Sequence, residues 1–138
     1  MISAIWVDID GTLADVDHRR HFIENKNWNA FFNAMVNDPL IEPIASIVHR
    51  FYDTHKIILC SGRPEDYRQQ TEDWLDDFMI PYHELNMRAS GDYRSDVIVK
   101  REMLKRLSAE GYEFLFCLDD RKTVVCYRDW ETDRKSVV

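Results

Sequence analysis

Short runs of apolar residues alternate along the chain with stretches whose apolar positions recur every three or four residues. Continuous apolar runs at Ile2 to Val7, Ile57 to Cys60 and Phe114 to Leu118 predict buried strands, and Glu84 to Arg88 is a weaker extended segment. The stretches between them have helical spacing, and this alternation is typical of a mostly parallel sheet with helices on both faces. We therefore predict one Rossmann-like α/β/α domain of three layers over residues 1–138.

The helical pattern falls on four segments, namely residues 28–36, 44–52, 65–78 and 97–107. The aromatic stripe of the first helix, from Trp28 to Phe32, favours core packing over stacking on nucleobases. Pro43 and Pro64 suit the first turns of the second and third helices, because proline has no N–H to donate there. Ser95 or Asp96 is expected to cap the fourth helix.

The composition excludes several classes of protein. Acidic residues outnumber basic ones 25 to 18, a net charge of −7, which argues against a broad basic surface for long nucleic acid. The four glycines are too widely separated for a Walker P-loop or a dinucleotide-binding fingerprint, so we expect no kinase domain. Three cysteines without CxxC spacing, Cys60, Cys117 and Cys126, indicate reduced thiols of a cytoplasmic protein. We expect no signal peptide and no membrane span.

Polar residues that could catalyse a reaction or bind a ligand follow each of the three stronger predicted strands. These turns are Asp8-Ile9-Asp10-Gly11-Thr12, Ser61-Gly62-Arg63-Pro64 and Asp119-Asp120-Arg121. The carboxyl ends of parallel strands meet at one edge of a sheet, where ligands bind. Carboxylates gathered at the end of an apolar strand are costly without a cation, and an all-oxygen set of ligands indicates Mg²⁺.

Together with Lys100 in the fourth helix, this ordered set resembles the four motifs of the haloacid dehalogenase superfamily. The chain is most similar to the 3′-phosphatase domain of phage polynucleotide kinase/phosphatase, over nearly all of residues 3 to 128. The likeness rests on the three turns above, on Tyr67-Arg68-x-x-Thr71-x-x-Trp74-Leu75, on Met87-Arg88 and on Gly91-Asp92-x-Arg94-x-Asp96-Val97-x-x-Lys100. It implies a haloacid dehalogenase-like fold and the removal of 3′-phosphates from polynucleotide ends or nucleotides.

The resemblance also implies roles for individual residues. Asp8 would be the nucleophile that forms an aspartyl-phosphate, and Asp10 the general acid/base. We expect Mg²⁺ to be held by Asp8, the backbone carbonyl of Asp10 and Asp120. The residues expected around the phosphate are Thr12, Arg19, Ser61, Gly62, Arg63 and Lys100. We expect Arg63 to lie at a helix N-terminus, which is an intrinsic anion site. Supporting roles are expected for Asp96, which would orient Lys100, for Asp119, which would orient a metal-bound water, and for Arg121.

Two other functions fit the same residues. A phosphatase of free nucleotides or small phosphate monoesters would have a sealed cleft, and the segment 14–43 is long enough to form a small helical cap over it. An open cap would instead admit a polynucleotide end. A receiver-like phospho-acceptor domain also places Asp, Thr and Lys at strand ends with Mg²⁺. In that domain the acidic pair follows the first strand and the phosphorylated Asp comes later. The order in this chain is the reverse.

The end of the sequence departs from the family pattern. The family continues with a glycine and a further hydrophobic strand, whereas residues 129–138 are polar apart from Val137 and Val138. We therefore expect a truncated or non-native tail. The sheet edge left unpaired by it would favour a homo-oligomer, in which copies associate through that edge.

Overall fold

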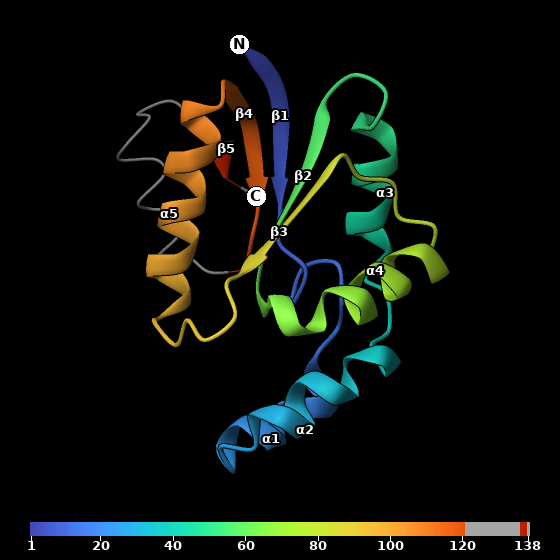
Figure 1. Ribbon diagram of the computed structural model, residues 1–138. Coiled ribbons are helices and arrows are strands. Elements are labelled where there is room, and N and C mark those ends of the chain that lie inside the picture. Colours follow the sequence, from blue (N-terminus) through green and yellow to red (C-terminus); the bar gives the residue numbers. More distant parts are fainter. Residues whose placement is uncertain (121–135, 138) are drawn as a thin grey trace.

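A parallel sheet forms the centre of the molecule. The computed structural model describes residues 1–120 together with the backbone of residues 136 and 137. The strand order is β3-β2-β1-β4-β5, so β1 occupies the middle (Figure 1). The strands are β1 (Ile2–Val7), β2 (Lys56–Pro64), β3 (Glu84–Arg88), β4 (Tyr112–Leu118) and β5 (Ser136–Val137). The carboxyl end of β1 is therefore flanked by the ends of β2 and β4.

Helices cover both faces of the sheet. One face packs against α5 (Asp96–Ala109), and the other against α3 (Glu42–Phe51) and α4 (Arg68–Asp77) (Figure 1). This confirms the three-layer α/β/α architecture predicted from the alternation of apolar runs and helical periodicity. The side chain of Ser95 caps α5 by accepting a hydrogen bond from the backbone N–H of Ile98 at 3.4 Å.

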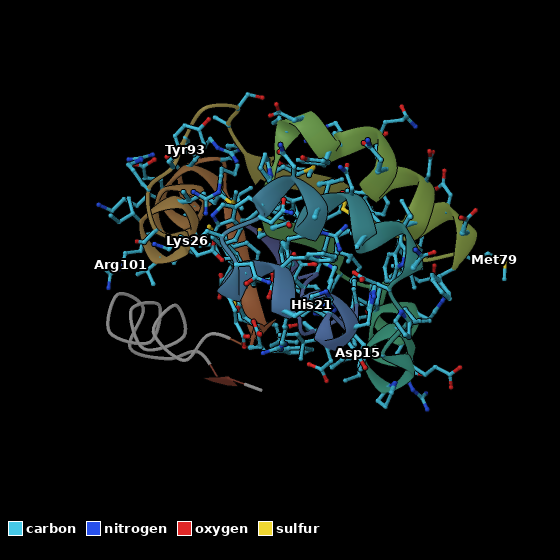
Figure 2. The ribbon with its side chains drawn as sticks, turned by 90° about the horizontal axis from the view of Figure 1, so that it is seen from below. Asp15, His21, Lys26, Met79, Tyr93 and Arg101 are labelled. Carbon is cyan, nitrogen blue, oxygen red and sulfur yellow. The ribbon has the colours of Figure 1, made fainter. Side chains whose placement is uncertain are left out.

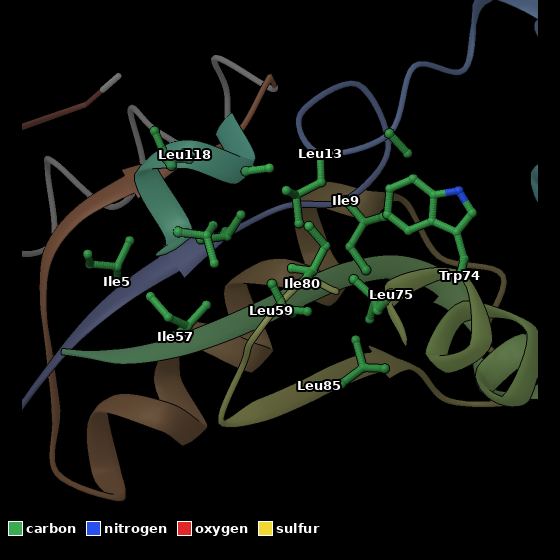
Figure 3. Packing of buried hydrophobic residues seen from close by; sticks show 14 of the residues in the cluster. Ile5, Ile9, Leu13, Ile57, Leu59, Trp74, Leu75, Ile80, Leu85 and Leu118 are labelled. Carbon is green, nitrogen blue, oxygen red and sulfur yellow. The ribbon is translucent and has the colours of Figure 1, made fainter. Parts of the chain in front are cut away.

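Two apolar cores fix the position of β1. Ile5 and Val7 belong to the core under α3 and α4, whereas Ala4 and Trp6 belong to the core under α5. Both faces of the strand are buried, which is why its sequence is continuously apolar rather than alternating. Figure 3 shows the first core, whose labelled side chains include Ile5, Ile9, Leu13, Ile57, Leu59, Trp74, Leu75 and Leu118. Full burial of such side chains stabilises the fold by about 1.5–3 kcal/mol each, so the end of β1 is held rigidly.

The segment 14–43 lies beyond the carboxyl ends of the strands. It contains α1 (His21–Glu24) and α2 (Trp28–Asn33) (Figure 1), flanked by 3-10 turns at Asp17–Arg19 and Ala34–Asn37. The predicted helix of residues 28–36 is thus divided, because its last turn tightens into the 3-10 form. None of the helices in the part of the chain that the structure describes is long and apolar enough to cross a membrane.

The start of α4 differs from the prediction. We expected Pro64 in the first helical turn, but β2 extends through Pro64, a 3-10 turn follows at Glu65–Tyr67, and α4 begins at Arg68. Pro64 has φ −63° and ψ 147°. Proline fixes φ near the same value in extended chain and in a first helical turn, so the residue type alone cannot distinguish the two.

The tail is described only in part. Arg121, Cys126 and residues 129–135 lie outside the described residues. Ser136 and Val137 pair in parallel with Phe116 and Cys117 of β4. The sheet edge that we expected to be unpaired therefore has a strand along it at these positions.

Candidate active site

Asp8 directly follows β1 and is buried at the centre of the sheet edge. The Nζ of Lys100 lies 2.8 Å from its Oδ1, and the Oγ1 of Thr12 donates to its Oδ2 at 3.5 Å. Burial raises the pKa of the Asp8 carboxyl well above its usual value; Lys100 acts in the opposite direction, and Asp119 and Asp120 raise the pKa further. A negative charge on Asp8 is therefore costly even beside Lys100, and a second cation would stabilise it.

Three carboxylates converge at this point. Asp8, Asp119 and Asp120 each offer an oxygen, and these atoms lie within 4.8 Å of one another. The Oδ2 of Asp119 accepts hydrogen bonds from Lys100 Nζ at 2.9 Å and from Trp6 Nε1 at 3.2 Å, whereas Asp120 is exposed. The donors are all hard oxygens, which is the set that Mg²⁺ prefers. These residues fit the predicted metal, with Asp119 held in place by Trp6 and Lys100.

Asp10 has a different environment, although it lies only two residues from Asp8. Its Oδ1 accepts hydrogen bonds from Arg63 Nε at 3.0 Å, Arg63 Nη2 at 2.6 Å and Arg19 Nη2 at 2.8 Å. Burial raises the pKa of the Asp10 carboxyl, but the guanidinium groups of Arg63 and then Arg19 outweigh it and hold the pKa below its usual value. The two carboxyls thus have opposite tendencies, since Asp8 resists ionisation and Asp10 favours it.

Asp38 is a residue of the site that the sequence did not reveal. Its carboxylate is buried, and Oδ1 accepts from Arg19 Nε at 2.8 Å and contacts His18 Nε2 at 2.6 Å. Its Oδ2 accepts from Arg19 Nη2 at 2.7 Å and from Arg63 Nη2 at 3.4 Å. No local pattern in the sequence links Asp38 to arginines 19 and 25 positions away. Both arginines are held between Asp38 and Asp10.

Most residues predicted to bind phosphate lie around the two aspartates. Thr12 and Lys100 contact Asp8. Arg19 and Arg63 are both 0% exposed and bind Asp10 and Asp38, so in this structure they position the general acid/base candidate. Their contact with phosphate remains a prediction. The expected place of Arg63 at a helix N-terminus is wrong, because it lies within β2.

The remaining predicted residues lie in the last part of β2 or beside it. The Oγ of Ser61 accepts a hydrogen bond from the backbone N–H of Arg63 at 3.0 Å. A Cβ on Gly62 would lie 2.3 Å from Oδ1 of Asp96, so glycine allows Asp96 to approach β2. Asp96 forms an ion pair with Arg88, and Arg88 Nε also donates to the carbonyl of Gly62 at 2.8 Å. Lys100, which we expected Asp96 to orient, is held by two other carboxylates.

Gly11 allows the turn that brings the carboxylates together. Its φ is +80°, and a Cβ at this position would lie 2.2 Å from Oδ2 of Asp120. We expect Gly11→Ala to lower the free energy of unfolding by about 1–2 kcal/mol, because an L-residue is strained at this φ. The methyl group would also displace Asp120, and we expect the Mg²⁺ affinity to fall by about tenfold. Chemical denaturation and calorimetric Mg²⁺ titration measure the two effects.

Gly91→Ala is the matched control for that prediction. Gly91 also has φ +80°, but its added Cβ would meet no atom within 4 Å. The control should reproduce the backbone strain and leave the Mg²⁺ affinity unchanged. An equal loss of Mg²⁺ affinity in both variants would contradict the role given to Gly11.

A cleft of about 710 Å³ opens above these carboxylates. Asp8, Asp10 and Asp120 line its floor. Its sides are lined by residues of α1, of α2, of the turn before α4 and of the loop between β3 and α5. Among the lining side chains are Trp28, Phe32, Tyr67, Tyr93 and Arg94. A volume of this size lies within the range of ligand pockets and exceeds the space needed by a phosphate group alone.

Residues 2–132 match the family model described as the polynucleotide kinase PNKP phosphatase domain. The chain belongs to this family. It is a haloacid dehalogenase-like phosphatase domain, as the motifs at the strand ends predicted.

Individual relatives agree with this membership. A protein of Autographa californica nuclear polyhedrosis virus, named "Putative bifunctional polynucleotide kinase/RNA ligase", is 27% identical over 131 residues, which are 93% of this chain and 18% of the viral protein. Two solved structures, described as a Pnkp1/Rnl/Hen1 complex and a Pnkp1/Rnl/Hen1 RNA repair complex, match with TM-scores of 0.82 and 0.83 at 31% and 30% identity. Each match covers 99% of this chain, and it covers 46% of the first solved chain and 43% of the second. The chain therefore spans less than half of these relatives.

Proposed function

We propose that this domain is a Mg²⁺-dependent phosphomonoesterase that removes 3′-phosphates from polynucleotide ends through an aspartyl-phosphate on Asp8. The observation that carries the proposal is that Asp8 and Asp10 lie together on the floor of a cleft of about 710 Å³. The names of the relatives, which refer to a polynucleotide kinase, an RNA ligase and RNA repair, support a nucleic acid end as the substrate.

The residues of the site suit the two halves of such a reaction. In the first, an oxygen of Asp8 attacks phosphorus in line, the bond from phosphorus to the sugar oxygen breaks, and Asp10 gives its proton to that oxygen. In the second, the ionised Asp10 takes a proton from water, the water oxygen attacks phosphorus, and Asp8 leaves as a carboxylate. The low pKa of Asp10 favours the ionised form that the second half needs.

Lys100 and a bound Mg²⁺ would balance the negative charges of the carboxylates and the phosphate. Lys100 offsets the charge of Asp8 and would face the non-bridging phosphate oxygens. Asp8, Asp120 and the carbonyl of Asp10 would hold Mg²⁺, which when bound polarises the phosphate and reduces its repulsion from Asp8. The phosphate dianion would oppose the pull of Arg19 and Arg63 on Asp10, and so help Asp10 to carry the proton that the first half requires.

Phosphate release from four substrates tests the proposal. These are a 3′-phosphorylated oligonucleotide, a 5′-phosphorylated oligonucleotide, a 3′-mononucleotide and an aryl phosphate. We expect kcat/KM to be higher by at least about tenfold for the 3′-phosphorylated oligonucleotide, since binding of the remote parts of a substrate contributes to catalysis. EDTA should abolish turnover and Mg²⁺ should restore it.

Each contrary outcome favours a different function. Equal rates on all four substrates would reject the polynucleotide end and favour a phosphatase of small monoesters. A stable phosphorylated Asp8 that is not hydrolysed would favour the phospho-acceptor domain. Full activity in EDTA would remove Mg²⁺ from the proposal.

A further inference from the structure

Three aromatic side chains form a continuous row along one wall of the cleft. The ring centroids of Trp28 and Phe32 in α2 lie 6.3 Å apart at an interplanar angle of 27°. The rings of Phe32 and Tyr67 follow at 5.0 Å and 31°. All three residues line the cleft that has Asp8 on its floor. We call Trp28, Phe32 and Tyr67 the aromatic row.

Core packing accounts for Phe31 of α2 and for Met35 of the following 3-10 turn, but it does not account for Trp28. Phe31 is 6% exposed and packs against the guanidinium of Arg19, whose Cζ lies 4.3 Å from the ring centroid. Met35 is fully buried. Trp28, in contrast, is 51% exposed although it contacts both phenylalanines. The helix thus buries one aromatic residue in the fold and presents a tryptophan face at the cleft.

A further exposed ring lines the cleft from the loop between β3 and α5. Tyr93, in the loop between β3 and α5, lines the same cleft and is 95% exposed. Hydrogen bonds from Arg88 to the carbonyls of Gly62 and Asp92 tie this loop to β2. Figure 2, which looks onto the carboxyl ends of the strands, shows Tyr93 at one edge of the molecule and Met79 at the opposite edge. A fourth aromatic ring therefore lines the cleft from a different segment of the chain.

The cleft has one chemical character at its floor and another at its mouth. The floor has carboxylates beside Lys100 and fits a phosphate with a metal ion, and the aromatic row adds flat apolar faces to the same cleft. A ligand that is anionic at one end and flat and aromatic at the other matches both parts. Nucleobases stack on aromatic side chains in a sequence-tolerant way, because every base has a π face.

We propose that the nucleobase of the 3′-terminal nucleotide stacks on the aromatic row while its 3′-phosphate is held at Asp8. This inference rests on the proposed function and adds to it a substrate class, namely phosphates attached to a nucleoside, without preference among the bases. Trp28 is then a binding residue. Phe32 stacks against the Trp28 ring, and Tyr67 in turn contacts the ring of Phe32.

Substrates with and without the terminal base test the inference. One oligonucleotide ends in a 3′-phosphorylated nucleotide, and its partner ends in a 3′-phosphorylated abasic sugar. We expect Trp28→Ala to lower kcat/KM on the first by at least about tenfold and to have no effect on the second. Trp28→Phe should retain most of the activity, because a phenyl face still stacks. Met79→Ala, which removes an exposed apolar side chain outside the cleft, is the matched control.

The outcomes separate this inference from the proposed function. An equal loss on both substrates, or no loss on either, would overturn the stacking site while leaving 3′-phosphatase activity intact. If the wild type releases no phosphate from either substrate, the proposed function fails. In that case the inference is tested by binding of both oligonucleotides to the Asp8→Asn variant and to the Asp8→Asn, Trp28→Ala double variant. Tighter binding of the base-bearing oligonucleotide that is lost in the double variant supports the stacking site. Equal binding of the two oligonucleotides to Asp8→Asn overturns it.

Discussion

Asp8→Asn is expected to lower turnover by about 10⁴-fold or more while leaving the protein folded. The substitution removes the oxygen nucleophile and keeps the shape of the side chain, and loss of a nucleophile has effects of this size or larger. The fold should tolerate it well. Because burial raises the pKa of the Asp8 carboxyl, the ionised side chain opposes folding at neutral pH in the metal-free protein. We therefore expect the Tm of metal-free Asp8→Asn to equal or exceed that of the wild type.

We expect Lys100→Ala to have the opposite effect on the Tm. Lys100 lies 2.8 Å from Asp8 and 2.9 Å from Asp119, and its removal leaves two buried carboxylates without their cation. Its Tm should fall clearly below that of the wild type. Mg²⁺ should raise the Tm of the wild type through ligand binding, and do so less in Asp8→Asn. Substantial turnover by Asp8→Asn would remove Asp8 from the nucleophile role, and a large fall in its Tm would contradict the electrostatic argument.

Asp38→Asn is expected to lower the free energy of unfolding by about 3 kcal/mol, because it leaves Arg19 and Arg63 buried with Asp10 as their remaining carboxylate. Since those guanidinium groups hold Asp10, we also expect kcat on a sugar phosphate to fall by about 10²-fold. The loss should be smaller on an aryl phosphate, whose leaving oxygen needs less help from a general acid. Denaturation and the ratio of the two activities measure these effects.

A surface substitution in the same segment is the control. Asp17 pairs with Arg20 at 2.9 Å, but its side chain is 76% exposed. Asp17→Asn should change stability by less than about 1 kcal/mol and leave turnover unchanged. If Asp38→Asn lowers activity on both substrates by the same factor, Asp38 stabilises the fold without positioning the acid.

Most of the site residues that the sequence predicted lie next to strand ends, whereas Lys100 lies in α5. Asp8, Ser61 and Asp119 each follow or end an apolar run, and parallel strands bring such ends together at one edge. The contacts that the sequence did not predict join distant side chains. Trp6 donates to Asp119 across 113 positions, and no local pattern indicates such a pair.

The contacts of Arg19 and Arg63 were also not predictable from the sequence. Their side chains are long, and a motif gives the position of a backbone without the direction of its side chain. Arg63 was placed at a helix start, whereas it lies buried in a strand and faces Asp10 and Asp38. Similarly, the segment 14–43 was expected to form short helices over the cleft, but its sequence gave no reason to expect that Asp38 holds both arginines.

The central position of β1 affects how the domain forms during translation. Asp8 leaves the ribosome before its partners Lys100 and Asp119, which are made about a hundred residues later. At a synthesis rate of about 5–20 residues per second, this delay is on the order of ten seconds. The nascent chain therefore carries the residue proposed as nucleophile for that time without a functioning site. Phosphatase chemistry can begin only when β4 joins the sheet.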